Sequence, residues 1–542
     1  MVRRPNCLPL VAHAGRHDRR TAIVDSQGVF RYRDLLDASS RWAEALLAGQ
    51  DDLQEKRVAF LLTPGFAWVA VQWGIWRAGG VAVPLPMNSA KPELEYLIDD
   101  AAASALVGDA EAVPLLASVG AARGLRTFTY DRSEPDPLCD PEPARLPDIA
   151  SGRRAMILYT SGTTSRPKGV VTTHANIAAQ ILSLVEAWEW SPEDRIVLCL
   201  PLHHVHGIIN VVGCALWSGA TCEMLPRFDA TAVWDAIASG NVTLLMAVPT
   251  VYVKLMAAWE RASPERRAEL SRACEGLRLM VSGSAALPVS TLKRWKEISG
   301  HTLLERYGMT EIGMALSNPL HGLRVPGSVG TPLPGVEVQL VGEDDRQVGP
   351  AMPGEIEVRG PSVFGEYWGQ PAATRAAFRD GWFRTGDTAI LENGVYRILG
   401  RSNLDILKTG GHKVSALEIE EALREHPAIA ECAVVGIPDS EWGERVAAAV
   451  VLKDERKNGQ KESVADRESG VPDDSCALDL ASLRSWARQL LTAHKLPSRL
   501  LVLDELPRNA MGKIMKPAVT ALFESQGDGD SIDMGTSWPT KQ

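Results

Sequence analysis

Short apolar segments recur along the first 400 residues of the chain and alternate with longer amphipathic segments. The apolar segments are rich in aliphatic and β-branched residues and end at polar residues, glycine or proline, which is typical of buried strands. They cover residues 57–62, 154–160, 195–200, 242–248 and 277–283, and helices are expected over segments such as 32–47 and 229–237. This alternation predicts βα units around largely parallel sheets.

The pattern changes after residue 335. Residues 336–341, 354–360 and 395–401 alternate strictly between apolar and polar positions and are separated by glycine and proline turns. Strict alternation of this kind is typical of antiparallel strands with one buried face. A small β-barrel-like subdomain is therefore expected beside the parallel sheets.

A second unit is expected from about Arg401 onwards, because a new mixture of helical and strand patterns begins there. Helices are expected over 416–425 and 480–494, and strands over 430–438, 445–453 and 500–507. The fold class is therefore α/β, with a large N-terminal domain of mainly parallel sheets flanked by helices and a small mobile α+β C-terminal domain. The predicted boundaries are an N-terminal domain over 1–400, a hinge over 401–405, a C-terminal domain over 406–524 with a disordered insertion at 453–478, and a disordered tail over 525–542.

Composition narrows the classes of protein that fit. The chain has 542 residues, 45% of them hydrophobic, and a formal net charge of −10, so a broad positive surface for nucleic acid is not expected. The cysteines are scattered without a CxxC pair, which favours reduced thiols. No apolar segment approaches the ~20 residues of a membrane span. We expect a soluble cytoplasmic protein, monomeric or homodimeric, without nucleic acid or membrane partners.

One loop carries candidate chemistry. Residues 159–169 read YTSGTTSRPKG and follow an expected strand. Backbone N–H groups and hydroxyls of such a loop can bind phosphate oxygens, and Lys168 can supply a positive charge. The spacing is not that of the Walker motif, because Lys168 follows Gly162 by six residues. Taken alone, the loop is equally consistent with a solvated Ser/Thr-rich turn.

The loop resembles the phosphate-binding signature of the acyl-adenylate-forming enzymes, which include acyl-CoA synthetases, luciferases and peptide-synthetase adenylation domains. The resemblance continues in order through SGSAAL (282–287), ERYGMTE (305–311), GWFRTGD (381–387), GR (400–401), KTGGHKVSALEIE (408–420) and PRNAMGKIMK (507–516). Ser165 stands where the family most often has glycine. Collinear motifs along nearly the whole chain make this resemblance specific.

The resemblance implies a reaction in two halves. A carboxylate first attacks the α-phosphorus of ATP and releases pyrophosphate, and a thiol then displaces AMP from the acyl adenylate. It implies nucleotide or CoA contacts at Thr160, Ser161, Gly162, Thr163, Thr164, Lys168, Gly283, Ser284, Ala285, Glu305, Arg306, Tyr307, Gly308, Asp387, Arg401, Gly410 and Gly411. Residues 160–164 and Lys168 would hold phosphates, and Tyr307 with the small residues 283–285 would hold adenine. Asp387 and Arg401 would bind ribose, and the glycines at 410 and 411 would let CoA approach.

The same resemblance assigns the catalytic roles. Glu311 would coordinate Mg²⁺ and Thr310 would contact the α-phosphate, which suits a hard cation among oxygen ligands. Lys513 would swing in during adenylation to neutralise developing negative charge. His204 would lie beside the acyl pocket and the thiol tunnel. The hinge residue of the family matches Asn403, where aspartate or lysine is usual, so its role as the pivot is open.

The segment PLHHVHGIIN (201–210) and the segment HGLRVPGSVG (321–330) bear on the acid that is activated. A zinc site at the histidines is an alternative, but no second cluster of ligands lies nearby in sequence. An arginine near the acyl end would suit a second carboxylate, whose burial is costly unless it is paired. These segments resemble the malonyl-CoA synthetase branch, in which residues matching His206, Ser282 and Arg324 bind the distal carboxylate. The competing interpretation pairs Arg324 with a surface acid.

We therefore expect an AMP-forming acid–thiol ligase that uses ATP, Mg²⁺ and coenzyme A to make malonyl-CoA, and also methylmalonyl-CoA if a branch at C2 fits. A ligase for another short- or medium-chain acid remains open. A non-catalytic nucleotide-binding protein is disfavoured, because the charged residues of the motifs are all present. A domain that loads a carrier protein is a further alternative, but free CoA is the simpler acceptor.

Overall fold

The computed structural model describes residues 8–130, 146–160, 167–402, 404–410, 412–440, 442–453, 478–508, 514–525 and 532–533. The chain divides into two compact units. Unit 1 comprises Met1–Gln339, Glu357–Thr385 and Asn393–Tyr396, and unit 2 comprises Leu340–Ile356, Gly386–Glu392 and Arg397–Gln542. The boundaries predicted from the sequence, with a hinge at 401–405, stay a prediction.

A nine-stranded sheet runs through unit 1 in the order β15-β14-β13-β12-β11-β9-β10-β1-β2. Neighbouring strands from β1 to β13 are parallel, and β2, β14 and β15 add antiparallel edges. The strands are β1 (Thr21–Asp25), β2 (Gly28–Arg31), β9 (Arg195–Leu198), β10 (Thr221–Met224), β11 (Leu244–Ala247), β12 (Leu279–Ser282), β13 (Leu304–Met309), β14 (Gly313–Ser317) and β15 (Thr331–Pro332). The central strands are continuous apolar runs because helices cover both of their faces.

A seven-stranded sheet in the order β18-β8-β7-β4-β3-β5-β6 is the second sheet of unit 1. Its strands are β3 (Arg57–Leu61), β4 (Val81–Pro84), β5 (Ala105–Asp109), β6 (Arg126–Tyr130), β7 (Arg154–Thr160), β8 (Lys168–Thr173) and β18 (Glu366–Tyr367). The strands from β7 to β6 are parallel, whereas β8 and β18 are antiparallel to their neighbours. The parallel βα units predicted from the sequence are confirmed.

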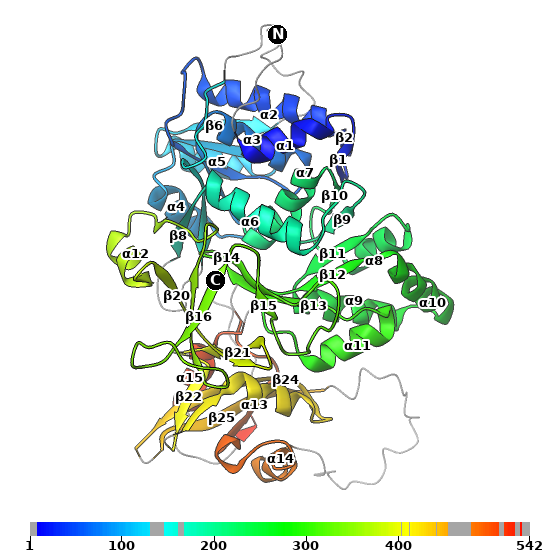
Figure 1. Ribbon diagram of the computed structural model, residues 1–542, viewed down its shortest axis with the longest axis vertical. Coiled ribbons are helices and arrows are strands. Elements are labelled where there is room, and N and C mark those ends of the chain that lie inside the picture. Colours follow the sequence, from blue (N-terminus) through cyan, green and yellow to red (C-terminus); the bar gives the residue numbers. More distant parts are fainter. Residues whose placement is uncertain are drawn as a thin grey trace. The chain divides into compact units, whose positions relative to one another are not determined.

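The helices of unit 1 pack on these sheets. They are α1 (Pro9–Ala14), α2 (Tyr32–Leu47), α3 (Phe66–Arg77), α4 (Lys91–Asp100), α5 (Val113–Ala121), α6 (His174–Ala187), α7 (Cys214–Ser218), α8 (Ala230–Ala238), α9 (Pro249–Arg261), α10 (Pro264–Ala273), α11 (Val289–Ser299) and α12 (Pro371–Ala377). In Figure 1, α8 to α11 lie together beside β11 and β12, and their apolar side chains share one core around Trp234, Tyr252 and Trp295. A π-helix, η2 (His206–Gly213), precedes α7.

Helix α6 begins at a capping box. The Thr173 hydroxyl accepts the backbone N–H of Asn176 at 3.1 Å, and the Asn176 side-chain oxygen accepts the N–H of Thr173 at 3.0 Å. This reciprocal pair satisfies backbone donors that the first turn of a helix leaves without partners. The start of α6 is therefore fixed directly after β8.

The alternating segments after residue 335 form a five-stranded sheet, as the sequence predicts. Its strands are β16 (Glu337–Val341), β17 (Gly354–Arg359), β19 (Phe378–Arg379), β20 (Trp382–Glu392) and β21 (Val395–Arg401). Strands β16, β17, β20 and β19 follow one another in the sheet, and β21 pairs with β20. The turn at Gly381 has a φ of 81°, a backbone conformation that glycine adopts without strain.

Unit 2 has a sheet in the order β23-β22-β25-β26-β27, with β24 paired to β25. Its elements are β22 (Ile406–Thr409), β23 (His412–Ser415), α13 (Ala416–Arg424), β24 (Ile429–Asp439), β25 (Gly443–Leu452), α14 (Leu480–Ala487), η6 (Ala493–Lys495), β26 (Arg499–Val502), α15 (Lys516–Ser525) and β27 (Ile532–Asp533). This α+β architecture is the one expected for the C-terminal part.

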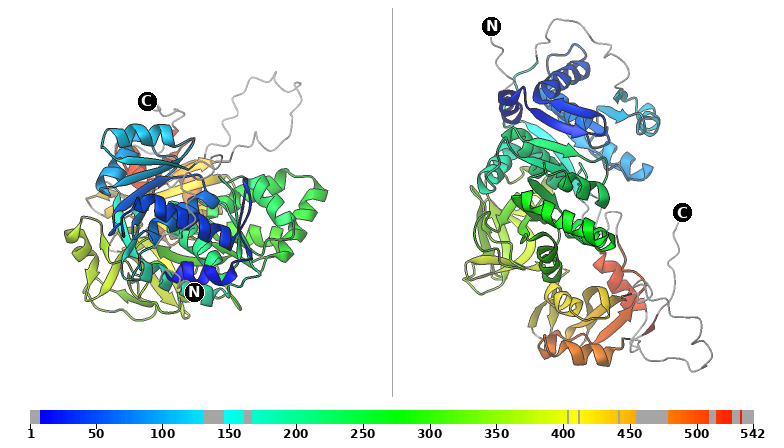
Figure 2. Two further views of the ribbon diagram at one scale, coloured as in Figure 1. Left: turned by 90° about the horizontal axis from the view of Figure 1, so that it is seen from above. Right: turned by 90° about the vertical axis from the view of Figure 1, so that its right-hand side faces the viewer.

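The two faces of the unit 2 sheet are covered by different helices. Cys432 and Val434 of β24 share a core with α13 and α14, whereas Ala433 and Val435 share a core with Phe523 of α15. Successive side chains of a strand point to opposite faces, so α13 and α14 cover one face and α15 covers the other. The yellow and orange elements in Figure 1 and Figure 2 show this layering. No helix among the described residues combines the length and apolar character that crossing a membrane requires.

Candidate active site

The flanks of the predicted phosphate loop form a hairpin between β7 and β8. Thr160 at the end of β7 lies opposite Lys168 at the start of β8. Residues Ser161 to Thr164, which the sequence assigns to phosphate binding, lie outside the described residues. The Lys168 ammonium lies 5.1 Å from the ring centroid of Tyr367, in strand β18. The hairpin therefore holds Lys168 beside an aromatic ring at the end of the sheet.

The turn between β13 and β14 carries Thr310 and Glu311. Glu311 is buried, and its Oε1 accepts a hydrogen bond from the Tyr367 hydroxyl at 3.0 Å. The backbone carbonyl of Glu311 accepts the N–H of Phe364 at 2.7 Å. Tyr367 therefore links Lys168 to Glu311, two residues that the sequence assigns to the phosphate and metal site. Sequence reasoning missed Tyr367, which lies in GEYWG outside the quoted motifs.

Strand β12 ends in a tight turn where the adenine contacts are expected. Ser284 has a φ of 70°, a conformation that non-glycine residues rarely adopt and that is often found at functional sites. A Cβ atom at Gly283 would lie 2.5 Å from Cζ of Arg306, so a side chain at position 283 would displace this guanidinium. Tyr307 follows directly in β13. The turn brings its small residues next to β13.

Three polar side chains, those of His206, Ser284 and Arg306, meet at this turn. Together with Ser282, which precedes the turn at the end of β12, we call them the Arg306 cluster. The Ser284 hydroxyl lies 3.3 Å from Nδ1 of His206 and 3.4 Å from Nη2 of Arg306. The side chains of His206, Ser282 and Arg306 are almost fully buried. Nε2 of His206, Oγ of Ser282, and Nε and Nη1 of Arg306 have no hydrogen-bond partner within the described part of the chain. Buried polar atoms are rarely left in this state, and each costs about 1–3 kcal/mol.

Burial sets the charges of the Arg306 cluster. It lowers the pKa of Arg306 to about 9, which leaves the guanidinium cationic at neutral pH. Burial, and secondarily the charge of Arg306, lowers the pKa of His206 well below its usual value, so the imidazole is neutral. The cluster therefore presents one buried positive charge together with hydrogen-bonding groups. Such a site is complementary to a carboxylate.

Arg324 has a different environment. Its Nε, Nη1 and Nη2 donate to the backbone carbonyls of Pro319 at 3.2 Å, Thr302 at 2.5 Å and Leu320 at 2.8 Å. All three nitrogens are thus engaged with the backbone of its own loop and of residue 302. The sequence assigns the distal carboxylate to Arg324 and nucleotide contact to Arg306. Of these two arginines, Arg306 is the one with guanidinium nitrogens, Nε and Nη1, that lack a hydrogen-bond partner among the described residues.

The remaining histidines of PLHHVHGIIN lie next to the cluster in sequence. The His203 and His204 rings are 4.2 Å apart, and burial lowers the pKa of both, to about 3 for His203. Within the described ranges, no group of three or more potential ligands is arranged to hold a metal ion. The histidines thus show the geometry of packed neutral side chains.

The predicted residues Asp387, Arg401 and Gly410 belong to unit 2. Asp387 Oδ1 lies 3.3 Å from Nε of Arg401, which brings together the two side chains assigned to ribose. Gly410 has a φ of 55° and lies against the Trp442 ring. A Cβ atom at position 410 would lie 2.8 Å from this ring. Asn403, Gly411 and Lys513 lie outside the described residues.

The comparisons with known proteins agree on one family. The model of the AMP-binding enzyme family matches residues 10–368, and the model of the AMP-binding enzyme C-terminal domain matches residues 418–513. The human protein "Malonate--CoA ligase ACSF3, mitochondrial" is 44% identical over 96% of this chain and 93% of its own. "Malonate--CoA ligase" of Arabidopsis thaliana is 39% identical over 88% of this chain and 80% of its own.

A solved structure is similar over the same extent. The crystal structure of ATP-bound MatB from Rhodopseudomonas palustris matches with a TM-score of 0.83 and 33% sequence identity. The match covers 96% of this chain and 99% of that one. The similarity therefore extends over both the large and the small part of the fold.

Proposed function

This chain belongs to the AMP-binding enzyme family, and from that premise we propose that it is an ATP-dependent malonate–CoA ligase. It forms malonyl-AMP and pyrophosphate, and then transfers the malonyl group to CoA with release of AMP. The curated relatives described as malonate–CoA ligases support this substrate. The cytoplasmic location and the monomeric or homodimeric state stay predictions.

The observation that carries the choice of acid is the Arg306 cluster. A monocarboxylic acid with an apolar tail would leave the buried guanidinium and the nearby N–H and O–H groups without partners. A second carboxylate at the far end of a short acid supplies the missing acceptors and neutralises the charge. We therefore assign the distal carboxylate of malonate to Arg306, with His206 and Ser282 as further contacts. The earlier assignment to Arg324 stays a prediction that the variants below separate.

The adenylation half-reaction draws on the residues joined by Tyr367. Lys168 supplies positive charge for the phosphates, and Thr310 supplies a hydroxyl for the α-phosphate. Glu311 fits Mg²⁺, because a buried carboxylate on a tight turn is a hard oxygen ligand, and substrate phosphates and water complete such sites. When bound, Mg²⁺ neutralises phosphate charge. Tyr367 holds the carboxylate of Glu311 in one orientation through its hydroxyl.

Residues of unit 2 are proposed to take part in both half-reactions. Asp387 and Arg401 are proposed to bind the ribose, because a carboxylate accepts hydrogen bonds from both ribose hydroxyls. Lys513 is proposed to stabilise the charge that builds during adenylation, and Gly410 and Gly411 to let the pantetheine arm of CoA approach closely. His204 is proposed to lie beside the path of the thiol.

An assay with a panel of acids tests the function. Purified protein with ATP, Mg²⁺ and CoA should release pyrophosphate faster with malonate than with acetate, octanoate or coumarate, and Lys513→Ala should abolish the release. Equal rates across the panel would remove the dicarboxylate assignment and leave a ligase for another acid. Nucleotide binding without turnover on any acid would support a non-catalytic protein.

A further inference from the structure

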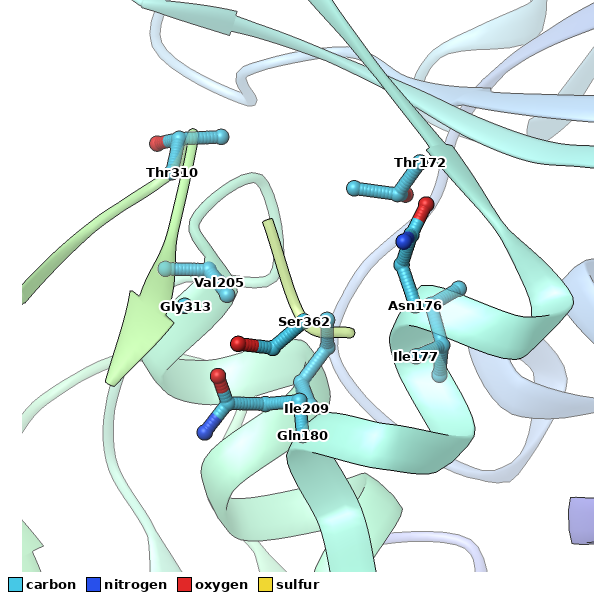
Figure 3. A pocket seen from close by; sticks show the side chains of 9 residues that line it. All are labelled: Thr172, Asn176, Ile177, Gln180, Val205, Ile209, Thr310, Gly313 and Ser362. Atoms are coloured by element: carbon cyan, nitrogen blue, oxygen red, sulfur yellow. The ribbon is translucent and has the colours of Figure 1, made fainter. Parts of the chain in front are cut away.

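A small cavity of mixed polar and apolar lining lies beside the turn that carries Thr310 and Glu311. Its volume is about 10 Å³, and its polar lining includes Thr172, Asn176, Gln180, Thr310 and Ser362. Figure 3 shows the Gln180 side chain extending from α6 toward Gly313, with Ser362 close by. Thr310 lies farther away, on the connection between β13 and β14. Gln180 lies outside the family motifs, and the proposed mechanism does not use it.

Gln180 contacts the backbone of the turn directly. Its Oε1 accepts the N–H of Met314 at 2.6 Å, and its side chain is 2% exposed. A Cβ atom at residue 313 would lie only 1.5 Å from the same Oε1, and Gly313 itself has a φ of 65°. The absence of a side chain at 313 therefore leaves the space that the Gln180 amide occupies, and glycine also adopts the left-handed backbone there without strain.

Two other groups fix neighbouring peptides of the turn. The Ser362 hydroxyl donates to the carbonyl of Ile312 at 3.0 Å, and the N–H of Phe364 donates to the carbonyl of Glu311 at 2.7 Å. Together with the bond from Met314 to Gln180, these contacts hold the peptides on the C-terminal side of Glu311. Gln180 provides the contact from the helical side.

The second amide atom of Gln180 has no partner among the described residues. Its Nε2 is buried, and the residue lines the cavity. A cavity of this volume holds about one water molecule if polar partners surround it. Thr172 and Thr310 line the cavity, and their hydroxyl oxygens can accept hydrogen bonds from such a water. A buried amide donor left unpaired would cost about 1–3 kcal/mol.

We propose that Gln180 is a positioning residue for Thr310 and Glu311. It acts through its acceptor bond from Met314 and through one water molecule that its Nε2 holds in the cavity. This inference rests on the proposed function, in which the turn binds Mg²⁺ and the α-phosphate of ATP. Loss of Gln180 lets the turn shift, and the carboxylate and hydroxyl that it carries move with it.

The test compares Gln180→Met with Gln72→Met in the full-length protein. Gln72 is a matched control, because it is also buried in unit 1, at 1% exposure, and its Nε2 contacts Met156 rather than the turn. Gln180→Met should raise the Kd for ATP in the presence of Mg²⁺, and the Mg²⁺ concentration for half-maximal pyrophosphate release, by about tenfold or more, as loss of groups that orient metal ligands does. The KM for malonate should stay within about twofold in both variants.

Gln180→Glu adds a readout that a merely structural role would not move. Burial raises the pKa of the introduced carboxyl, and its protonated form keeps both a carbonyl acceptor and a hydroxyl donor. Activity relative to the wild type should therefore fall as pH rises and the carboxyl ionises. A pH profile parallel to that of the wild type, or equal ATP and Mg²⁺ effects in Gln180→Met and Gln72→Met, would overturn the proposal.

Failure of the proposed function gives a different result. A wild-type protein that binds ATP with Mg²⁺ but releases no pyrophosphate with any acid would contradict the ligase. In that case, the Kd values for ATP of Gln180→Met and Gln72→Met still test whether Gln180 positions the turn.

Discussion

Replacing Arg306 by methionine should lower the preference for malonate and raise the stability of the ligand-free protein. In the bound state, the distal carboxylate of malonate would lose its buried cation, and removing one partner of such a pair costs about 3–5 kcal/mol. At 1.36 kcal/mol for each tenfold change, kcat/KM for malonate should fall by roughly 10²–10⁴-fold. Acetate has no distal carboxylate, so its kcat/KM should stay the same or rise.

The same substitution should stabilise the ligand-free protein. Arg306 is a buried cation with two nitrogens that lack partners among the described residues, so its desolvation is not compensated there. An apolar side chain of similar length removes that cost, and we expect the free energy of unfolding to rise by about 1–3 kcal/mol. Urea unfolding monitored by tryptophan fluorescence measures this change.

Arg324→Met is the matched control. The Arg324 guanidinium donates to three backbone carbonyls, so this variant should lower the free energy of unfolding instead of raising it. Its malonate-to-acetate ratio should change far less than that of Arg306→Met. The reasoning is refuted if Arg306→Met slows malonate and acetate equally, or if Arg324→Met alone loses the preference for malonate.

Three further predictions follow from the contacts of other buried groups. Tyr367→Phe should raise the Mg²⁺ requirement of pyrophosphate release by about tenfold or more, because the hydroxyl orients Glu311; an unchanged requirement would contradict this. Lys516→Met should lower the free energy of unfolding of unit 2 by about 3–5 kcal/mol, since the buried ammonium lies 2.8 Å from Oε1 of Glu420. Loss of an exposed ion pair should cost under about 1 kcal/mol. Burial lowers the pKa of His174 from 6.5 to about 3. The stabilising contribution of the neutral imidazole is therefore complete above pH 6.5, and it falls by up to roughly 1.4 kcal/mol per pH unit as the pH drops below 6.5. His174→Phe should flatten this slope of the free energy of unfolding, measured between pH 3 and pH 6.5.

Much of unit 1 could be predicted from the sequence because its strands are buried on both faces. The apolar run at 154–160 coincides with β7 (Arg154–Thr160), and the helical pattern at 32–47 coincides with α2 (Tyr32–Leu47). Continuous apolar runs and amphipathic periodicity depend on local burial, which the sequence records directly. In unit 2, the helix expected over 480–494 is shorter, since α14 ends at Ala487. The apolar Leu491 still packs in the same core, from a turn, so periodicity alone overestimates the helix.

The link between Lys168 and Glu311 could not be predicted in the same way. It depends on the two-residue strand β18 (Glu366–Tyr367), which pairs with β8 although the two are far apart in sequence. So short a strand has no periodicity to detect, and its antiparallel pairing with β8 is what brings the Tyr367 ring over Lys168. The role of Tyr367 could therefore be found only from the folded structure.

Arg306 and Arg324 show a second limit of prediction from the sequence. Sequence similarity indicates that an arginine binds the distal carboxylate, but it does not report which guanidinium already has its donors satisfied. That depends on the backbone carbonyls of Thr302, Pro319 and Leu320, which all accept hydrogen bonds from Arg324. The proposal of Arg306 instead of Arg324 thus rests on hydrogen-bond geometry rather than on residue type.

Some of the buried groups of unit 1 that lack hydrogen-bond partners among the described residues belong to the Arg306 cluster or to the helix beside it, whereas others, such as those of Trp73, Trp190 and Ser218, lie elsewhere. His206 and Asn210 lie in the π-helix η2, a rare conformation that is frequent at functional sites, and Ser282 and Arg306 lie on adjacent parallel strands. Leaving these groups unpaired lowers the stability of the free protein, whereas a bound dicarboxylate would repair the loss only in the complex. Groups arranged in this way favour the one ligand that satisfies them and disfavour acids that leave them buried and unpaired. The instability of the empty site and its selectivity for a diacid therefore have the same physical cause, and a variant that removes the first should also remove the second.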